Sequence, residues 1–474
     1  MSLFPFQFHN VLDKKLITND AGEFFLTSEK NLKNMIDRNI DQNFSDFLFD
    51  KGFQYKEEND LYWNNFKFKL IKRKKIPDKI GYYMIIPTLR CNLNCTYCQV
   101  SRADENAKNY DWEEEHLNLF YKLIENNNHK HVKIEFQGGE PTLRSDIIKK
   151  ILDWTSANNI KAELVICTNL QNLDSNLLEI IDHDNVFIST SIDGKKTLHE
   201  KQRTEDKGTT DVFFNNLDYV LNKYGINKVS ALPTFTDFSK IEETIDFYIE
   251  LGLKSIFLRP VNYQGFARKK FPSSKNQVSE WSKAYFSSLE KLFIKNHKNK
   301  QDQRILEFGF ENSLKRIFNI GYNGYVDLRS PNFYAKDNII IDFDGKFYPS
   351  DEARMLSRIK IIDFSIGNLK DGLDSKKITD LNWNSIGETN PDCINCAYQP
   401  YCGVDMVDDI SRYNRIDIPK HLTAFCQSQM SKFNFIFEKI TSMDPVDIFN
   451  INGHLSKNFN YQPPFGKIFY DTTH

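Results

Sequence analysis

The sequence predicts an α/β protein built on a partial, TIM-like (β/α)6 barrel, with a small α+β unit before it and an irregular, cysteine-rich extension after it. Three observations predict this fold class. β-rich apolar runs alternate with amphipathic helical stretches between residues 82 and 258, the alternation stops after about residue 300, and separate apolar clusters precede residue 76. Repeated strand–helix units imply a parallel sheet with right-handed crossovers, either open or curled into a partial barrel.

The N-terminal unit is expected over residues 1–76. Residues 16–26 read as two short strands around a turn, and Ser28 is well placed to cap the helix that follows. Another apolar cluster occupies residues 44–53. The basic stretch and the proline within residues 72–77 predict a linker.

The barrel is expected over residues 77–300. Its six strands are predicted at residues 83–88, 132–136, 162–167, 186–190, 228–235 and 255–258, and helices at residues 112–124, 147–154, 213–221 and 241–251. Functional sites in such sheets lie at the carboxyl ends of the strands.

The extension is expected over residues 301–440, followed by a tail over residues 441–474. Residues 338–348 predict a hairpin, because an Asp-Gly pair at residues 344 and 345 separates two apolar runs. A helical pattern occupies residues 431–440.

Composition excludes several classes of protein. The chain carries 62 basic and 64 acidic residues, a formal net charge of −2, which disfavours a broad nucleic-acid surface and hence nucleic-acid modification. No apolar run approaches the roughly 20 residues of a membrane span, and the N-terminus lacks the pattern of a signal peptide. Eight cysteines without such a peptide predict metal ligands or core thiols in a reducing cytoplasm.

Three cysteines follow the first predicted barrel strand: Cys91, Cys95 and Cys98, in a C-x3-C-x2-C run. Three thiols in one short loop indicate a metal site, because core packing does not explain them. A structural zinc or a closed iron–sulfur cluster takes four protein ligands, so three ligands on a four-iron cluster leave one iron open. The alternatives are a partial zinc knuckle and a chance spacing.

This loop, with an aromatic residue (Tyr97) before its last cysteine and a position after the first strand of a (β/α) series, resembles that of the radical S-adenosylmethionine (SAM) superfamily. The resemblance implies that the three thiolates hold a [4Fe–4S] cluster whose fourth iron binds SAM. Reductive cleavage of SAM then yields a 5′-deoxyadenosyl radical. The cofactor supplies this chemistry and the protein orients it.

The same resemblance implies a set of cofactor-binding residues at the strand ends: Tyr97, Gly138, Gly139, Glu140, Thr168, Asn169, Ser191 and Arg203. The two glycines permit close backbone approach, and Glu140 offers an anionic acceptor for the methionyl ammonium group. Helix capping remains an alternative role for Ser191, and a surface ion pair remains one for Arg203.

Four cysteines near the C-terminus resemble the ligands of the SPASM extension of peptide-modifying radical SAM enzymes: Cys393, Cys396, Cys402 and Cys426. The full SPASM pattern supports two auxiliary clusters. Here Ser350 and Met406 replace two ligands of the first cluster, and no cysteine lies between residues 329 and 344.

The departures from the SPASM pattern predict one auxiliary [4Fe–4S] cluster, held only by protein ligands. A four-cysteine zinc site is the alternative, since spacing alone does not identify the metal. Cys167, the eighth cysteine, is interpreted as a small buried hydrophobe.

Asp351 follows Ser350 directly. In sulfatase maturases with this extension the matching aspartate is a base for the substrate radical, so the resemblance makes Asp351 a candidate catalytic residue. It is equally suited to an ion pair with Arg354. General-base work needs reach and a tuned pKa, which a sequence does not reveal.

Longer strings are similar to those of the B-type radical SAM maturases of the His-Xaa-Ser peptide system. They lie at residues 97–102, 135–141, 256–262, 324–328, 348–356 and 396–403. The resemblance implies a precursor peptide with His-Xaa-Ser repeats as the substrate, a companion radical SAM maturase and an electron donor such as flavodoxin or ferredoxin, all in the cytoplasm. No nucleic-acid or membrane partner is expected.

Two other functions remain open. The chain could be another SPASM-type enzyme that modifies peptides or proteins, for example one similar to sulfatase maturases, or a zinc-stabilised peptide-binding module without chemistry. The N-terminal unit resembles the winged-helix modules that grip a leader peptide as an added strand. A plain structural cap on the barrel is the alternative role for that unit.

Overall fold

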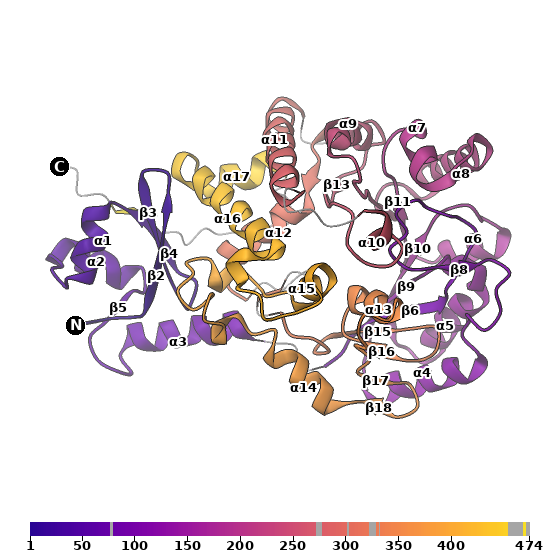
Figure 1. The fold of residues 1–474 in the computed structure, drawn as a ribbon, viewed down its shortest axis with the longest axis horizontal. Helices are drawn as coiled ribbons and strands as arrows, with labels where there is room; N and C mark the ends of the chain where they lie inside the picture. The colour runs from indigo at the N-terminus through magenta and orange to yellow at the C-terminus, as the bar shows by residue number, and fades with distance from the viewer. Residues whose placement is uncertain are drawn as a thin grey trace.

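A computed structural model of the chain describes residues 1–75, 79–271, 277–300, 303–321, 329–330, 332–453 and 468–470. The predicted string at residues 324–328 and the proline of the expected linker, Pro77, lie outside these ranges. Figure 1 shows the N-terminal unit at one end of the molecule, the barrel at the other and the C-terminal helices between them.

The main sheet has seven strands in the order β12-β11-β10-β9-β6-β15-β16. The first five predicted strands are confirmed and run parallel: β6 (Tyr82–Thr88), β9 (His131–Gly138), β10 (Lys161–Thr168), β11 (Val186–Ser191) and β12 (Val229–Leu232). The α/β fold class predicted from the alternating pattern is therefore correct.

The sixth predicted strand is much shorter than expected. β13 (Ser255–Ile256) pairs with β14 (Leu306–Glu307), and a single bridge between Phe235 and Pro260 connects this region to the end of β12. The other edge of the sheet holds the predicted hairpin, formed by β15 (Asn338–Ile341) and β16 (Phe347–Tyr348). β15 lies parallel to β6, so β6 is a central strand.

Helices pack on the outer face of this sheet. They are α4 (Glu114–Asn126), α5 (Ser145–Ala157), α6 (Ser175–Ile181), α7 (Lys196–His199), α8 (Lys207–Tyr224), α9 (Ile241–Glu250) and α11 (Gln277–Lys298). The short helix α10 (Ala267–Lys270) instead packs beside Tyr97 and Val261. The apolar residues that alternate along the strands are buried in the core that these helices share with the sheet.

The other face of the sheet carries half-buried polar side chains. Glu135, Cys167 and Ser189 occupy this face on three neighbouring strands, and the Cys167 thiol donates to the Glu135 carboxylate over 3.3 Å. Cys167 is thus a hydrogen-bonded thiol inside the partial barrel, and the interpretation of it as a simple hydrophobe was wrong. A polar inner face suits a site that takes in a substrate.

The N-terminal unit contains the predicted hairpin, β3 (Lys14–Asn19) and β4 (Phe24–Thr27), and a strand that the sequence did not predict, β2 (Phe6–Val11). Ser28 caps α1 as expected, since its hydroxyl accepts from the Asn31 amide. The remaining elements are β1 (Ser2–Leu3), α1 (Glu29–Ile36), α2 (Gln42–Asp50), β5 (Gln54–Tyr55) and α3 (Leu61–Lys74).

The expected basic linker is helical up to Lys74, because α3 continues through it. Arg73 is buried and its guanidinium donates to the carbonyls of Ala21 (2.9 Å), Arg316 (3.0 Å) and Pro400 (3.4 Å). A buried cation that bonds to three distant segments fixes the N-terminal unit against the rest of the chain. The prediction of a linker was wrong for residues 72–74, which belong to α3.

The C-terminal region is mostly helical. Its helices are α12 (Phe308–Phe318), α13 (Asp351–Arg358), α14 (Ser375–Trp383), α15 (Met406–Tyr413), α16 (Ala424–Ser442) and α17 (Pro445–Ile451). Short ladders complete the fold: β7 (Arg90–Cys91) with β8 (Ala103–Asp104), β17 (Gly367–Asn368) with β18 (Gly372–Leu373), and β19 (Phe469–Tyr470) with β4. Among the described residues, no helix has both the length and the apolar composition needed to cross a membrane.

Candidate functional site

The three N-terminal cysteines lie at the carboxyl end of β6, where the sequence placed them. Cys91 ends β7, and the Cys98 amide donates to the Cys95 carbonyl over 3.1 Å. Two backbone hydrogen bonds anchor this loop: the Thr96 amide donates to the Gln202 carbonyl, and the Ala267 amide donates to the Cys98 carbonyl. All three thiols are half-buried.

The electrostatic surroundings of these thiols differ. Burial, followed by the nearby Glu140 carboxylate and the other two thiols, raises the pKa of Cys91 to about 12. Burial also raises the pKa of Cys95, while the guanidinium of Arg203 opposes that shift. Arg203 therefore supplies a positive charge on one side of the cysteine loop.

Gly138 and Gly139 hold the second strand against this loop. A Cβ atom on Gly139 would lie 2.1 Å from the Arg90 carbonyl oxygen, and one on Gly138, whose φ is +132°, would lie 2.3 Å from that of Thr88. The Glu140 amide donates to the Arg90 carbonyl over 2.8 Å. Close backbone approach, of Gly138 to Thr88 in β6 and of Gly139 to Arg90 in β7, is thus enough to require glycine at both positions.

Glu140 is the carboxylate nearest to this loop among the predicted residues and is only 1% exposed. It accepts hydrogen bonds from the Asn169 amide (2.8 Å) and from the Thr142 amide and hydroxyl (3.2 and 2.7 Å). The Asn169 side chain in turn donates to Asn92 over 2.8 Å and approaches the Cys91 sulfur at 3.9 Å. The structure therefore brings the ends of β9 and β10 onto the cysteine loop.

Thr168, the last residue of β10, is buried and uses its hydroxyl locally. That hydroxyl accepts from the Leu170 amide over 3.1 Å and also contacts the Glu140 carboxylate. Burial of Glu140 outweighs this contact and its other hydrogen bonds, so the pKa of the Glu140 carboxyl is raised.

Tyr97 and Arg203 form a buried polar network with Asp193, a residue that the sequence reading did not select. The Tyr97 hydroxyl donates to the Asp193 carboxylate (2.7 and 2.9 Å) and accepts from the Arg203 guanidinium over 2.6 Å. Asp193 is 1% exposed. Its position two residues after Ser191, just past the end of a strand, was the signal that could have identified it.

The alternatives for Ser191 and Arg203 do not match the geometry. Ser191 ends β11, whereas the next helix begins at Lys196 with Lys195 as its N-cap. Arg203 is half-buried and bonds to Tyr97 instead of joining an ion pair on the surface.

Asp351 is ion-paired with Arg354, one of the two roles that the sequence left open. The guanidinium donates to the Asp351 carboxylate over 2.8 Å, and Arg354 is fully buried. Ser350 is the N-cap of α13 and accepts from the Ala353 amide. Met406 is buried in an apolar cluster with Tyr348. Ser350 and Met406 thus have structural roles.

A cavity of about 240 Å³ opens between the barrel and the C-terminal region. Asp351 does not line it, but its neighbour Glu352 does. Other polar lining residues include Arg259, Ser350, Asp405 and Lys432. The carboxyl groups facing this cavity are therefore not the one that the resemblance selected.

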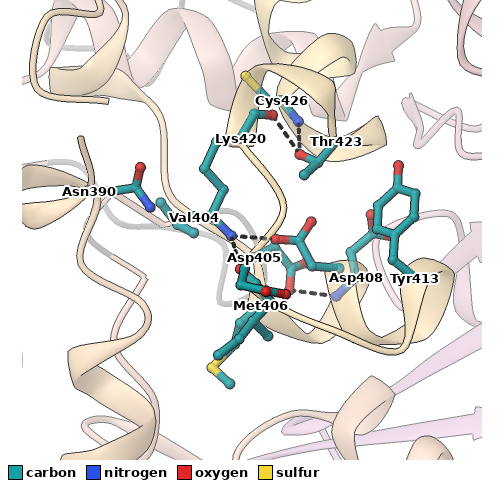
Figure 2. Close-up of polar contacts among 12 residues, drawn as sticks. Asn390, Val404, Asp405, Met406, Asp408, Tyr413, Lys420, Thr423 and Cys426 are labelled. Atoms are coloured by element: carbon teal, nitrogen blue, oxygen red, sulfur yellow. Dashed lines mark hydrogen bonds and ion pairs between the residues drawn. The ribbon is translucent and has the colours of Figure 1, made fainter. Parts of the chain in front are cut away.

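The four C-terminal cysteines surround a second cavity of about 50 Å³: Cys393, Cys396, Cys402 and Cys426. Cys426 lies at the start of α16, where its amide donates to the Thr423 hydroxyl. Figure 2 shows the Lys420 side chain extending from a position beside Cys426 and Thr423 toward Asp405 and Met406 at the start of α15. There its ammonium pairs with the buried Asp409.

Four thiols from three separate segments line this second cavity, and four cysteines are the donor set of a [4Fe–4S] cluster held by protein alone. Burial raises the pKa of Cys393 to about 12 and that of Cys426 to about 11, and the positive charge on Lys420 opposes both shifts. In the described part of the chain, no three His, Cys, Asp or Glu side chains are close enough together to hold a single metal ion.

Asp405 predicts a pH dependence of stability. Its carboxylate caps α15 by accepting from the amides of Val407 and Asp408, and burial, followed by the charge of Asp408, raises its pKa to about 8. An unfolded aspartate has a pKa near ~4. Between about pH 4 and about pH 8 the Asp405 carboxyl therefore keeps its proton in the folded state and loses it in the unfolded state. The free energy of unfolding falls as pH rises through this range.

We expect the urea midpoint of the wild-type chain to drop more between pH 6 and pH 8.5 than that of Asp405→Asn, because asparagine also caps helices but does not ionise. Equal drops in the two proteins would contradict this assignment.

Part of the chain is similar to known proteins. Residues 85–254 match the Radical SAM superfamily. Cysteine-type anaerobic sulfatase-maturating enzymes from Clostridium novyi and Clostridium perfringens are 24% and 23% identical over 372 and 395 residues. These alignments cover 74% of this chain and 93% and 95% of the two relatives.

An uncharacterized protein of Methanocaldococcus jannaschii is 30% identical over 187 residues, which are 38% of this chain; the match spans only 62% of that relative. Among solved structures, native anSMEcpe with bound AdoMet has a TM-score of 0.59 at 20% identity, covering 78% of this chain and 99% of the other. This likeness shows a shared fold.

Proposed function

We propose, starting from the radical SAM domain that residues 85–254 form, that the chain is a maturase that modifies a ribosomally made peptide. The observation that carries the proposal is the convergence of Cys91, Glu140 and Asn169 at the ends of three adjacent strands. A polar inner barrel face and a cavity beside it give a peptide segment a place to enter.

In this proposal Cys91, Cys95 and Cys98 hold a [4Fe–4S] cluster that binds SAM. When bound, the pair supplies a 5′-deoxyadenosyl radical. The protein's part is to bind and orient. Gly138 and Gly139 bring β9 against the cysteine loop, and Glu140 presents a buried carboxylate to the methionyl ammonium group.

Five further residues complete the proposed cofactor site. Thr168 and Asn169 position the end of β10, and Ser191 presents its hydroxyl at the end of β11. Arg203 is held by Tyr97 on the side of Cys95, where its charge offsets that of thiolates.

The auxiliary cluster is proposed at Cys393, Cys396, Cys402 and Cys426. Four protein thiols complete its coordination, so it has no open iron for a substrate. Its proposed place in the chain is the extension at residues 301–440, between the barrel at residues 77–300 and the tail at residues 441–474. Residues 1–76 form the proposed peptide-recognition unit.

The proposed substrate is a precursor peptide with His-Xaa-Ser repeats, in the cytoplasm, with a companion radical SAM maturase and a flavodoxin or ferredoxin as electron donor. One solved relative of the same fold, native anSMEcpe, is described with bound AdoMet and a peptide, at a TM-score of 0.59 and 19% identity. A substrate like that of the sulfatase-maturating relatives is the second candidate.

Asp351 is the proposed base only if its pair with Arg354 opens, because that pair occupies its carboxylate. Glu352 faces the cavity without such a move. Comparing Asp351→Asn with Glu352→Gln therefore belongs in the test of the function.

The test is mass spectrometry of a His-Xaa-Ser precursor after anaerobic co-expression with the chain. We expect a precursor mass that differs from the encoded one, and the encoded mass when Cys95→Ala replaces the wild type. An unchanged precursor, together with modification of a sulfatase-derived peptide, would favour the second candidate, a substrate like that of the sulfatase-maturating relatives. Colourless protein that holds only zinc after anaerobic reconstitution would refute the function.

A further inference from the structure

The chain's own C-terminal strand occupies one edge of the N-terminal sheet. That sheet has the order β19-β4-β3-β2, so β19 covers the edge of β4. Phe469 lies opposite Leu26 and Tyr470 opposite Thr27 in a parallel pairing. Figure 1 shows β4 in the N-terminal unit, at the opposite end of the molecule from the barrel.

The edge of β4 is equipped to hold a strand. The Leu26 amide donates to the Ile468 carbonyl over 2.8 Å, and the Thr27 hydroxyl donates to the Tyr470 carbonyl over 2.7 Å. The Asn31 side chain donates to the same Tyr470 carbonyl over 3.4 Å. Thr27 and Asn31 are each only 1% exposed, so two buried polar side chains are directed at one carbonyl of the added strand.

Two aromatic side chains, Phe44 and Phe47, lie beside this edge. The Tyr470 ring stacks on Phe44, with ring centroids 4.4 Å apart, and lies 4.9 Å from the ring of Phe47. Ile468 and Tyr470 are half-buried, whereas Phe469 is 40% exposed. This alternation gives specificity for an aromatic side chain at one position of an extended segment.

The strand that fills the edge is short. Within the described residues 468–470, β19 contains only Phe469 and Tyr470, so this described segment forms few backbone bonds. Its covalent tether to the same chain favours its binding to β4. Strand addition to an open edge is a common way for proteins to bind extended peptides. A longer segment of similar chemistry can therefore replace it.

We propose that the β4 edge, with Thr27, Asn31, Phe44 and Phe47, is a docking site for an extended segment of the precursor peptide with an aromatic side chain, and that residues 468–470 are its intramolecular competitor. This inference rests on the proposed peptide-modifying function. Docking then requires that the tail strand leave, so the chain binds its substrate only by exchanging one strand for another.

The experiment measures binding of a fluorescently labelled peptide with the sequence of residues 466–474 to the full-length chain, without SAM. We expect Tyr470→Ala to bind this peptide about tenfold more tightly than the wild type does, because the tethered competitor is weakened. Phe469→Ala is the matched control, since its side chain points outward, and it should bind like the wild type. Equal binding by the wild type and Tyr470→Ala would overturn the proposal.

Hydrogen exchange supplies a second measurement. The Leu26 amide should exchange faster in Tyr470→Ala than in the wild type and slow again when the peptide is added. Unchanged exchange at Leu26 would show that β19 does not protect this edge and would also overturn the proposal.

Unlabelled precursor peptide separates this proposal from the function on which it rests. Displacement of the label by the precursor supports docking even if the precursor is never modified. A precursor that is modified but leaves the label bound overturns the docking site and leaves the proposed function standing.

Discussion

Replacing Cys95 with alanine is expected to abolish formation of 5′-deoxyadenosine from SAM under reducing conditions. Two thiols alone do not hold the cluster that SAM requires, so the rate of 5′-deoxyadenosine formation should fall more than a thousandfold. A thousandfold loss corresponds to an activation barrier that is higher by ~4 kcal/mol. Iron content should fall from about eight to about four atoms per chain, since only the proposed auxiliary site remains. Iron analysis and chromatography of the nucleoside products measure both effects.

Cys167→Ala is the matched control for this prediction. Cys167 is also a half-buried thiol in the barrel, but its sulfur bonds to Glu135 and lies outside the cysteine loop. We expect this variant to keep about eight irons per chain and to form 5′-deoxyadenosine. Full iron content in Cys95→Ala would contradict the assignment of the three ligands.

Arg354→Met is expected to lower the free energy of unfolding by about 3–5 kcal/mol, the usual cost of removing one partner from a buried ion pair. Arg354 is fully buried, and its guanidinium lies 2.8 Å from Asp351 and 3.6 Å from the buried Asp342. Methionine fills the volume but leaves both carboxylates without their cation. Urea unfolding measures the change.

Lys360→Met, just beyond the same helix, is the matched control, since Lys360 is exposed and its loss should change stability by less than about 0.5 kcal/mol. Adding Asp351→Asn to Arg354→Met should recover part of the loss, because it removes one uncompensated charge. Additive losses in the double variant would show that the two side chains do not interact.

Much of the fold could be predicted because it depends on local pattern. The alternation of apolar runs located five parallel strands, and the Asp-Gly pair located the hairpin of β15 and β16. Ser28 was identified as a cap because N-caps are local. The same reasoning could not show that β15 pairs with β6, since that contact joins segments more than 250 residues apart in sequence.

The candidate site could also be predicted where its residues lie close together in sequence. The spacing of Cys91, Cys95 and Cys98 and the Gly-Gly-Glu motif both occur in short windows. Asp193 was missed because an aspartate after a strand looks like any turn residue until Tyr97 is placed beside it. Arg73 was misread because burial depends on Ala21, Arg316 and Pro400, which no local window contains.

The central place of β6 has a consequence for biosynthesis. β6 is made early, and one of its two neighbours, β9, follows within about 50 residues, but the other, β15, is made only at residues 338–341. Chains fold from the N-terminal side as they are made, at ~5–20 residues per second. A nascent chain thus presents its cysteine loop on an open sheet edge for roughly ten seconds or more, so loading of metal competes with aggregation until translation passes β15.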